Sequence, residues 1–353
     1  MKIAKLYGAK DIRIEDIPIP TIGPNDALIK IKVATICGSD LHAYRQIPGP
    51  KSQYVHNIFP NPPGLPIMPG HEWAGDVVKV GEKVKKIKEG DRVTGFQVFA
   101  FGCGKCYWCG RGVGFRCTDV ERVNGCFAEY IRMPNAGRAV FKLPEELSYE
   151  QGALVEPLAV AVAANTLAKP NIADNVVVLG AGSIGLFAMQ VFKNRACRVI
   201  GTEISRNRLK LAEKFGIDEV INPLDEDPIK KVMELTNDVG ADYTVDCAGI
   251  NATVQQAIDM VRGGGKVILT ASYRTIFNLN LVEMRWISLL GEMYGEGVGS
   301  YTMNDVEQAI YLIQKGFVKT DNIITHRFPL DQVKEALETG LDTEKSMKVL
   351  LEP

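Results

Sequence analysis

The segment VVVLGAGSIGLFAMQ constrains the fold of this chain more than any other part of the sequence. It places Gly180, Gly182 and Gly185 in the spacing G-x-G-x-x-G, directly after an apolar run and at the start of a helical segment. In a dinucleotide-binding turn the first glycine permits the tight turn, the second lets the backbone approach the pyrophosphate, and the third lets helix and strand pack closely. The phosphates then lie at the positive end of the helix. The segment therefore predicts a strand, a turn and a helix that bind a dinucleotide.

The next strand-like run, RVIGTE, ends at Glu203, at about the spacing of 20 residues expected for the acid of such a site. A carboxylate there can hydrogen-bond both hydroxyls of the adenosine ribose and repels a 2′-phosphate, which predicts NAD rather than NADP. Arg206 and Arg208 keep NADP open. The alternative is a vacant turn with Glu203 on the surface, which the combination of strand, spacing and acid disfavours.

The two parts of the chain differ in their pattern. After about residue 175, strand-like runs such as VVVL, RVIG and YTVD alternate with helical segments, which predicts an α/β fold with a doubly wound parallel sheet. Residues 1–150 carry short alternating runs separated by glycine and proline, which predicts a β-rich unit. A length of 353 residues favours two domains.

Charge and hydropathy exclude several classes of partner. The formal net charge is −1, so the chain creates no field that attracts nucleic acid or an anionic membrane. No run approaches the roughly 20 apolar residues of a membrane helix, and the opening MKIAKLYGAK lacks the apolar segment of a signal peptide. We expect a cytoplasmic protein.

Four cysteines crowd into the segment GCGKCYWCGRGVGFRC: Cys103, Cys106, Cys109 and Cys117. In a reducing compartment such crowding indicates a metal rather than disulfides. Four thiolates in a short glycine-rich loop can surround a tetrahedral ion and leave no open position, which defines a structural zinc site. The alternatives are four reduced cysteines without metal and a nucleic-acid-binding zinc ribbon, which would need a basic face.

Three further motifs carry the residues of an open metal site: CGSDLH, with Cys37, GHE, with His71 and Glu72, and VEPLA, with Glu156. A catalytic zinc takes about three nitrogen, sulfur or oxygen ligands and leaves a position for substrate. Cys37, His71 and a glutamate provide that mixture, and either Glu72 or Glu156 can be the glutamate. Each residue alone is weak evidence, because a single cysteine is usually a small core residue and a single glutamate is usually solvated.

The motifs CGSDLH and GHE, the four-cysteine segment, VEPLA and LGAGSIG follow one another along the chain. In this order the chain resembles the zinc-containing medium-chain alcohol dehydrogenases. It is most similar to the polyol branch, which includes sorbitol, xylitol and butanediol dehydrogenases, with threonine dehydrogenases as near relatives. The resemblance covers essentially the whole chain, to the terminal KVLLEP.

The resemblance implies a GroES-like β domain, formed by residues 1–157 and 295–353, and an inserted Rossmann NAD-binding domain over residues 158–294. It implies two zinc ions per chain. Cys37, His71 and Glu72 are similar to the catalytic zinc ligands, and Glu156 is similar to the acid near the fourth position, either ligating or linked through water.

The resemblance also implies roles in proton transfer and cofactor binding. Ser39 and His42 match a proton-relay serine and histidine. Glu203 and Arg208 match the pair that holds the adenosine ribose. The nucleotide site implied in this way consists of Gly180, Gly182, Ile184, Gly185, Glu203, Arg208, Cys247, Ala248 and Gly249.

The reaction implied is transfer of a hydride from a secondary alcohol of a small polyol, sugar alcohol or vicinal diol to NAD, with zinc as the Lewis acid. Two alternatives remain: an amino-alcohol oxidation like that of L-threonine 3-dehydrogenase, and a non-catalytic zinc- and nucleotide-binding redox sensor. The intact CGSDLH and GHE motifs disfavour the sensor. The family likeness also implies a homotetramer or homodimer, joined through the strand near Ser288–Met293.

Overall fold

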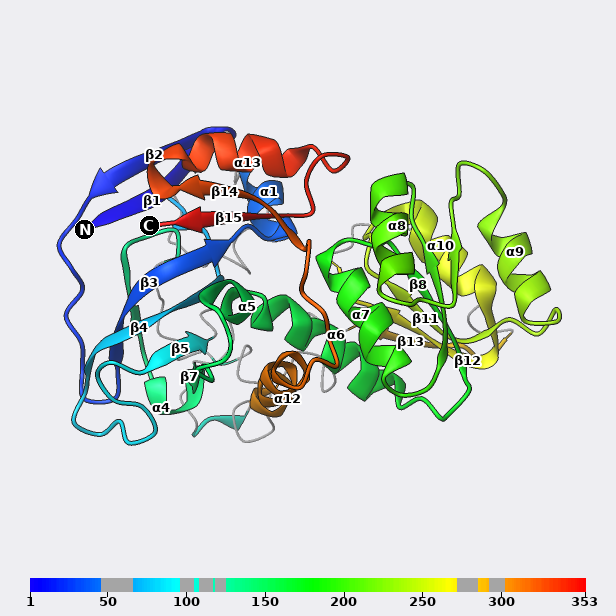
Figure 1. Ribbon diagram of the computed structural model, residues 1–353, viewed down its shortest axis with the longest axis horizontal. Coiled ribbons are helices and arrows are strands. Elements are labelled where there is room, and N and C mark those ends of the chain that lie inside the picture. Colours follow the sequence, from blue (N-terminus) through cyan, green and yellow to red (C-terminus); the bar gives the residue numbers. More distant parts are fainter. Residues whose placement is uncertain (46–65, 96–104, 108–116, 118–124, 272–284, 292–301) are drawn as a thin grey trace. The chain divides into compact units, whose positions relative to one another are not determined.

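The computed structural model describes residues 1–45, 66–95, 105–107, 117, 125–271, 285–291 and 302–353 (Figure 1). The chain forms two compact units. One consists of Met1–Glu156 together with Thr320–Pro353, and the other consists of Pro157–Lys319. None of the helices in these ranges is both long enough and apolar enough to cross a membrane.

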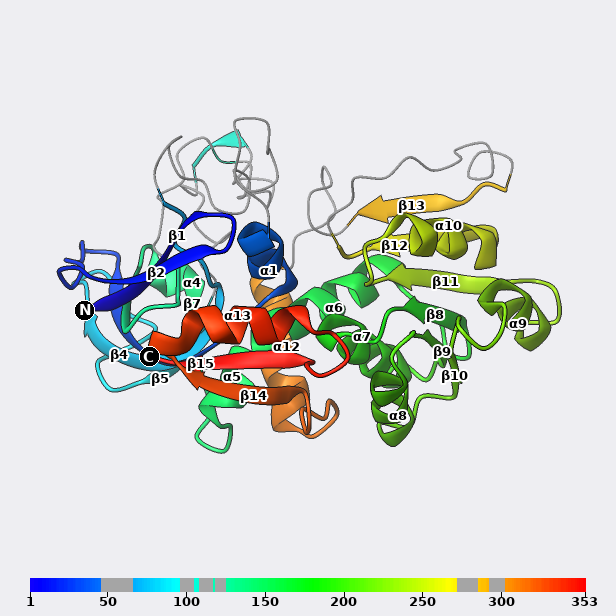
Figure 2. The same cartoon turned by 90° about the horizontal axis from the view of Figure 1, so that it is seen from above.

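The second unit is built on a six-stranded parallel sheet. Its strands are β8 (Asn175–Leu179), β9 (Arg198–Thr202), β10 (Glu219–Ile221), β11 (Ala241–Asp246), β12 (Val261–Leu269) and β13 (Ser288–Gly291). They lie in the order β10-β9-β8-β11-β12-β13, with β13 at one end (Figure 2). This is the order 3-2-1-4-5-6 of a dinucleotide-binding fold, and it reverses between β8 and β11. The predicted doubly wound sheet is confirmed.

Amphipathic helices alternate with these strands in the described residues: α7 (Ser183–Lys193), α8 (Arg206–Lys214), α9 (Pro228–Leu235) and α10 (Asn251–Met260). The largely apolar α6 (Val155–Ala168) precedes β8, and α12 (Met303–Gln314) follows β13. Val176, Val177 and Val178 of β8 have no exposed surface. Local signals begin two of the helices: the Asp227 side chain caps α9, and Thr302 and Asp305 form a capping box on α12.

The chain returns to the first unit at Thr320, whereas the sequence analysis placed this return at residue 295. Hydrogen bonds explain the difference. The Gln190 side chain of α7 bonds both the carbonyl and the N–H of Lys319, at 3.1 and 2.7 Å. The Thr166 hydroxyl of α6 lies 3.3 Å from an oxygen of Asp305 in α12. Helix α12 therefore belongs to the nucleotide-binding unit.

The first unit is β-rich, as predicted. Its strands are β1 (Lys2–Gly8), β2 (Asp11–Asp16), β3 (Ala27–Thr35), β4 (Glu72–Val80), β5 (Arg92–Gly95), β6 (Tyr130–Met133), β7 (Val140–Lys142), β14 (Ile324–Pro329) and β15 (Lys348–Glu352). The helical elements are α1 (Gly38–Arg45), α4 (Ala136–Ala139), α5 (Tyr149–Ala153), the short 3₁₀ turn η2 (Leu330–Gln332) and α13 (Val333–Leu341). The main sheet has the order β14-β15-β3-β4-β5-β7, with β6 also paired to β3.

The C-terminal segment is part of this sheet. Strand β15 runs antiparallel to β3, with Leu350 opposite Thr35, and the N–H of Ile36 donates to the carbonyl of Val349 at 2.9 Å (Figure 1). Helix α13 is joined to α1 by a hydrogen bond of 2.8 Å from the Tyr44 hydroxyl to Glu338. The last residues of the chain are thus fixed beside the segment that begins at Cys37.

Candidate functional site

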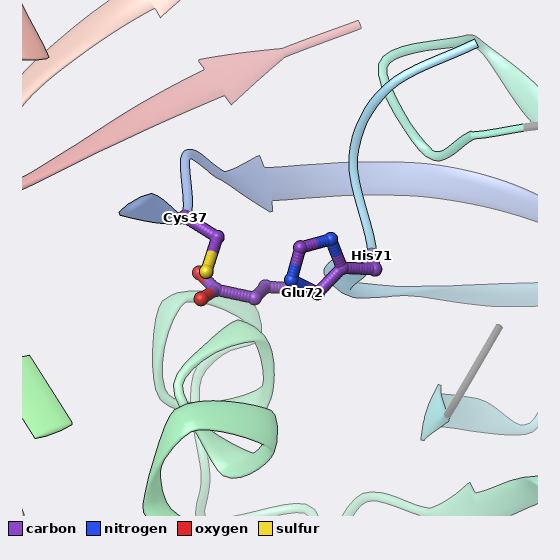
Figure 3. Close-up of side chains that lie close together, drawn as sticks. All are labelled: Cys37, His71 and Glu72. Atoms are coloured by element: carbon purple, nitrogen blue, oxygen red, sulfur yellow. The ribbon is translucent and has the colours of Figure 1, made fainter. Parts of the chain in front are cut away.

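Cys37, His71 and Glu72 lie together in the first unit. Cys37 follows β3 and precedes α1, His71 comes directly before β4, and Glu72 is the first residue of β4. Strands β3 and β4 pair antiparallel with Thr35 opposite Glu72, so the end of one strand meets the start of the other. One ligand atom from each of the three residues lies within 4.8 Å of the others (Figure 3).

Asp40 and Gly70 hold the two segments of this cluster in place. The Asp40 carboxylate accepts the N–H of Cys37 at 2.9 Å and the N–H of Gly70 at 3.0 Å, and it lies 3.9 Å from Nδ1 of His71. Gly70 has φ of +94°, and a Cβ there would come within 2.5 Å of the Phe127 ring. The sequence analysis did not identify Asp40, although an acid three residues after Cys37 has the spacing of a capping carboxylate.

Glu72 is fully buried and has its partners on neighbouring strands. Its carboxylate accepts a hydrogen bond from the Thr35 hydroxyl. Both of its oxygens also lie 2.8 Å from Nζ of Lys348, at the start of β15. Lys348 is 4% exposed and 276 residues distant in sequence. The sequence analysis missed Lys348 and Thr35, and no local pattern marks Lys348.

The electrostatics of the cluster favour a cation. Burial lowers the pKa of His71, but the charges of Cys37 and Asp40 outweigh it and raise that pKa well above its ordinary value. Burial likewise lowers the pKa of Lys348, and Glu72 and Cys37 reverse the shift and raise it. Since positive charge is stabilised here despite burial, the surroundings are anionic. Sulfur, nitrogen and oxygen donors in such surroundings fit a zinc ion.

Glu156 lies near this cluster but is not one of its three donors. It is in the first turn of α6, is 7% exposed, and its charge raises the pKa of both His71 and Lys348. Within the described residues, the group of ligand atoms that lie within 4.8 Å of one another contains Glu72 and not Glu156.

Ser39 and His42 lie on α1, which begins directly after Cys37. Ser39 is 7% exposed, and its hydroxyl has no hydrogen-bond partner in the described part of the chain. A buried hydroxyl without a partner is costly, which indicates that a ligand group completes its bonding. His42 is exposed and lies three residues further on, on the same side of the helix.

Two of the four clustered cysteines can be placed. Sγ of Cys106 and Sγ of Cys117 are 3.7 Å apart, and the two sulfurs are not joined by a disulfide. A disulfide would bring the sulfurs to about 2.05 Å, whereas two thiolates at about 2.3 Å from a tetrahedral zinc are separated by roughly 3.8 Å. The pair therefore fits shared ligation of one ion. Cys103 and Cys109 lie outside the described residues.

The glycine-rich turn of the second unit has the expected geometry. Gly180 has φ of +91° and packs against Ala248, and a Cβ on Gly185 would lie 1.9 Å from the Gly180 carbonyl oxygen. A Cβ on Gly182 would meet no atom of the described residues within 4 Å. Gly182 caps α7, and Ile184 is half-buried in its first turn. The open side at Gly182, at a helix N-terminus, fits a pyrophosphate.

Glu203 follows β9 beside this turn. One carboxylate oxygen accepts the N–H of Ala181 at 2.7 Å, and the other accepts those of Ile204 and Ser205 at 2.9 and 3.0 Å. Arg208 lies 3.9 Å from the same carboxylate. Arg206, which the sequence analysis considered as a partner for a 2′-phosphate, instead pairs with Asp225 at 2.7 Å.

Cys247, Ala248 and Gly249 follow β11, the strand next to β8. The N–H of Cys247 donates to the carbonyl of Leu179 at 2.9 Å, and Gly180 faces Ala248. The structure therefore brings these residues to the same edge of the sheet as the glycine-rich turn, where ligands of such folds bind.

A mixed-donor metal cluster and a dinucleotide turn on separate units define the class of zinc- and nucleotide-dependent oxidoreductases. Residues 23–145 match the alcohol dehydrogenase GroES-like domain, and residues 183–315 match the zinc-binding dehydrogenase domain. The chain belongs to the family of zinc-containing alcohol dehydrogenases. It is an enzyme with a GroES-like domain and a Rossmann domain, and it uses zinc and NAD(P) to oxidise or reduce a small molecule. The redox-sensor alternative is not supported.

Relatives within this family align over nearly the whole chain. Sorbitol dehydrogenase of Bacillus subtilis is 32% identical over 363 residues, covering 100% of this chain and 97% of the relative. L-threonine 3-dehydrogenase of Pyrococcus horikoshii is 35% identical over 347 residues, covering 96% and 93%. The crystal structure of 2R,3R-butanediol dehydrogenase from Bacillus subtilis matches with a TM-score of 0.81 and 27% identity, over 100% of this chain and 99% of that chain.

Proposed function

We propose that this enzyme transfers a hydride from a secondary alcohol of a small polyol, sugar alcohol or vicinal diol to NAD. The buried cluster of Cys37, His71 and Glu72 carries the proposal, because it joins one sulfur, one nitrogen and one oxygen donor. That donor set suits a zinc ion with a position left for substrate. The polyol class is supported by relatives that act on sorbitol and butanediol.

The residues of α1 supply the proton path. When bound, zinc supplies Lewis-acid activation of the alcohol, and the nicotinamide supplies the hydride acceptor. The Ser39 hydroxyl, buried and without a partner among the described residues, takes up the proton of the substrate hydroxyl as it gives its own proton onward. His42, exposed on the same side of the helix, is the terminal base that receives the relayed proton and releases it to solvent. The proton thus leaves a buried site without requiring water at the reacting carbon.

We assign the preference for NAD over NADP to Glu203. Its carboxylate is held beside the glycine-rich turn by three backbone N–H groups, so its negative charge stays where a 2′-phosphate would lie. Arg206 is engaged by Asp225. The position of this acid supports ribose recognition, with Arg208 as its neighbour.

L-threonine is the second candidate substrate. The observation that favours it is the identity of 35% to the threonine dehydrogenase of Pyrococcus horikoshii, compared with 32% to the sorbitol dehydrogenase. Oxidation of this amino alcohol uses the same metal and cofactor chemistry. It requires in addition a group that binds the substrate amine.

NADH formation across a panel of alcohols tests the assignment. The purified enzyme is mixed with NAD and sorbitol, xylitol, 2,3-butanediol or L-threonine, and NADH absorbance is followed. We expect the unchanged enzyme to have its highest kcat/KM with a polyol or diol. For His71→Ala we expect no turnover with any substrate. A kcat/KM for threonine that exceeds all the others would establish the second candidate. No turnover with any alcohol by zinc-loaded enzyme would refute both.

We further propose a homotetramer or homodimer joined through β13, the strand at the end of the parallel sheet as described. Trp286, just before this strand, is 86% exposed, which is unusual for so large an apolar side chain. Light scattering on Trp286→Glu compared with the unchanged enzyme tests this assembly. We also propose a cytoplasmic location, because a reducing environment keeps Cys37, Cys106 and Cys117 out of disulfides and able to bind zinc. Cell fractionation tests this location.

A further inference from the structure

Lys348 is a buried cation whose partner is a member of the metal cluster. Its ammonium donates to both oxygens of Glu72 at 2.8 Å and to the carbonyl of Ile36 at 3.3 Å. Only 4% of its side chain and none of that of Glu72 is exposed. Burial of such a pair is costly, and the loss of either partner leaves an uncompensated charge. Because the costly pair of Lys348 and Glu72 lies at the proposed metal site, we expect Lys348 to have a role in that site.

The backbone fixes where this ammonium can lie. Lys348 is the first residue of β15, and it is opposite Ile324 in the pairing with β14. The carbonyl of Lys348 accepts a hydrogen bond from the Thr325 hydroxyl at 3.3 Å. On the other side, the carbonyl of Val349 accepts the N–H of Ile36 at 2.9 Å. Lys348 is thus anchored from both sides, directly beside the Cys37 segment.

Glu72 does not depend on Lys348 alone for its position. Its backbone begins β4, opposite Thr35, and the Thr35 hydroxyl donates to its carboxylate. Lys348 adds a positive charge, which neither Thr35 nor the strand backbone provides. A carboxylate that already faces an ammonium attracts a second cation less strongly, and the two cations repel each other.

From these contacts, and resting on the proposed function, we infer that Lys348 is a positioning residue that acts through Glu72. It offsets the charge of the carboxylate and thereby limits how tightly the centre holds zinc. A carboxylate shared in this way donates less to the metal, so the metal is a stronger Lewis acid toward the alcohol.

The inference predicts an unusual sign for one substitution. Lys348→Met keeps much of the side-chain volume and removes the charge. Glu72 then has its full charge available, so the centre should bind zinc about tenfold more tightly or better. The metal-free protein should lose thermal stability, because its buried carboxylate lacks a cation, and zinc should restore most of that loss. A lysine that served only the fold would give the opposite, weaker zinc binding in a loosened site.

The experiment compares zinc affinity in full-length variants. Zinc is withdrawn from the purified enzyme by a chelator of known affinity. The zinc ion that the unchanged enzyme binds and His71→Ala does not is assigned to the catalytic centre. Lys348→Arg keeps the charge, so its zinc affinity should match that of the unchanged enzyme. This variant therefore separates the effect of charge from that of side-chain shape. In a Glu72→Gln background, Lys348→Met should tighten zinc binding by a smaller factor. Only the direct repulsion between the two cations is then relieved, and the part of the effect that passes through Glu72 is lost.

Arg132→Met is the matched control. Arg132 pairs at 2.7 Å with Asp26, a carboxylate that is 5% exposed, so this change also strips a buried carboxylate of its cation. Asp26 directly precedes β3, at the end of that strand away from Thr35 and Cys37. Arg132→Met should lower the thermal stability of the metal-free and zinc-loaded proteins equally, with zinc affinity unchanged.

The outcomes separate this inference from the proposed function. Tighter zinc binding in Lys348→Met that is clearly reduced with Glu72→Gln supports the role of Lys348. Unchanged or weaker binding, or tightening by the same factor with Glu72→Gln, overturns it. If the unchanged enzyme holds no zinc that His71→Ala lacks, the proposed metal centre itself fails.

Discussion

Glu72 of the first unit and Glu203 of the second are both buried, but their charges are balanced in different ways. Glu72, with no exposed surface, is paired with Lys348 from a strand 276 residues away. Glu203, 8% exposed, is held by three backbone N–H groups, from Ala181, Ile204 and Ser205. An ammonium cancels a carboxylate charge, whereas backbone dipoles solvate the charge and leave it in place.

This difference suits the role that we propose for each glutamate. At the glycine-rich turn, a full negative charge accepts ribose hydroxyls and repels a phosphate. At the metal cluster, a partly neutralised carboxylate can join Cys37 and His71 without making the centre strongly anionic. Carboxylates of similar burial are thus given different chemistry by their partners.

The largest effect is expected when the metal site of the first unit is lost and the nucleotide site of the second unit is left intact. His71→Ala deletes the nitrogen donor, so catalytic zinc and turnover should be lost. NAD binding, measured by calorimetry, should stay within about twofold, because the nucleotide turn is on the other unit. His326→Ala, at a half-buried histidine of β14, should change neither property. Normal turnover in His71→Ala would remove the metal centre from the mechanism.

The second prediction compares the two carboxylates directly by unfolding stability. Glu72→Gln leaves the Lys348 ammonium buried without a counter-charge and should cost about 3–5 kcal/mol. Glu203→Gln keeps one of the two accepting oxygens but turns its amide NH2 toward a backbone N–H, so it should cost less, about 1–3 kcal/mol. Urea denaturation of the zinc-free proteins measures both values. Equal losses would contradict the contrast between ammonium and backbone partners.

The third prediction concerns cofactor choice. Glu203→Ala removes the charge that repels a 2′-phosphate and the acceptor for the ribose hydroxyls. The ratio of kcat/KM for NAD to that for NADP should fall roughly 10- to 100-fold, the equivalent of one charged hydrogen bond. Glu213→Ala, at an exposed position of α8, is the control and should leave the ratio unchanged. A higher kcat/KM for NADP in the unchanged enzyme would already disprove the assignment of Glu203.

The fourth prediction tests the proton path on α1. Imidazole titrates at about pH 6.5 in model peptides, so a histidine that carries the proton acts best near neutral pH. His42→Gln should lower kcat/KM about tenfold or more near pH 7. The deficit should shrink at higher pH or with imidazole buffer, which can accept the proton instead. Parallel pH profiles, accompanied by lower thermal stability, would indicate a purely structural histidine.

The smallest expected effect on stability is at Asp218. This carboxylate has both an ammonium and a backbone N–H as partners. Burial raises the pKa of this carboxyl, but hydrogen bonds from Lys193 and from the N–H of Val199, each 2.7 Å, outweigh it and lower the pKa. A depressed folded-state pKa stabilises the protein above the unfolded value of about 4, and this contribution is lost as the pH falls through the folded pKa.

Asp218→Asn should therefore cost about 1 kcal/mol or less of unfolding free energy at pH 7. The difference from the unchanged enzyme should vanish toward pH 2–3, as judged by urea denaturation at each pH. Asp225→Asn removes the exposed partner of Arg206 and should have a smaller effect at every pH. A difference that did not depend on pH would show that the Asp218 charge contributes nothing.

The contiguous motifs were predictable because each encodes its own geometry. The glycines of the turn, the strand before them and Glu203 after the next strand lie in the predicted order. The CGSDLH motif begins directly before α1 and continues through the first five residues of that helix. Cys106 and Cys117 come together as a four-cysteine loop requires. Spacings of a few residues set directions on a helix or turn without help from the rest of the fold.

Three features were decided only by the tertiary structure. Lys348 is the cation that faces Glu72, and Asp40 bonds the segment before His71. The chain also returns to the first unit at Thr320. The pairing of Lys348 with Glu72 depends on the register of β15 against β3, and the boundary depends on hydrogen bonds from α6 and α7 to residues 305–319. The residues that these contacts join are between 30 and 276 positions apart in the sequence. No local spacing specifies them, because strand register and helix packing are set by the burial of whole faces against each other.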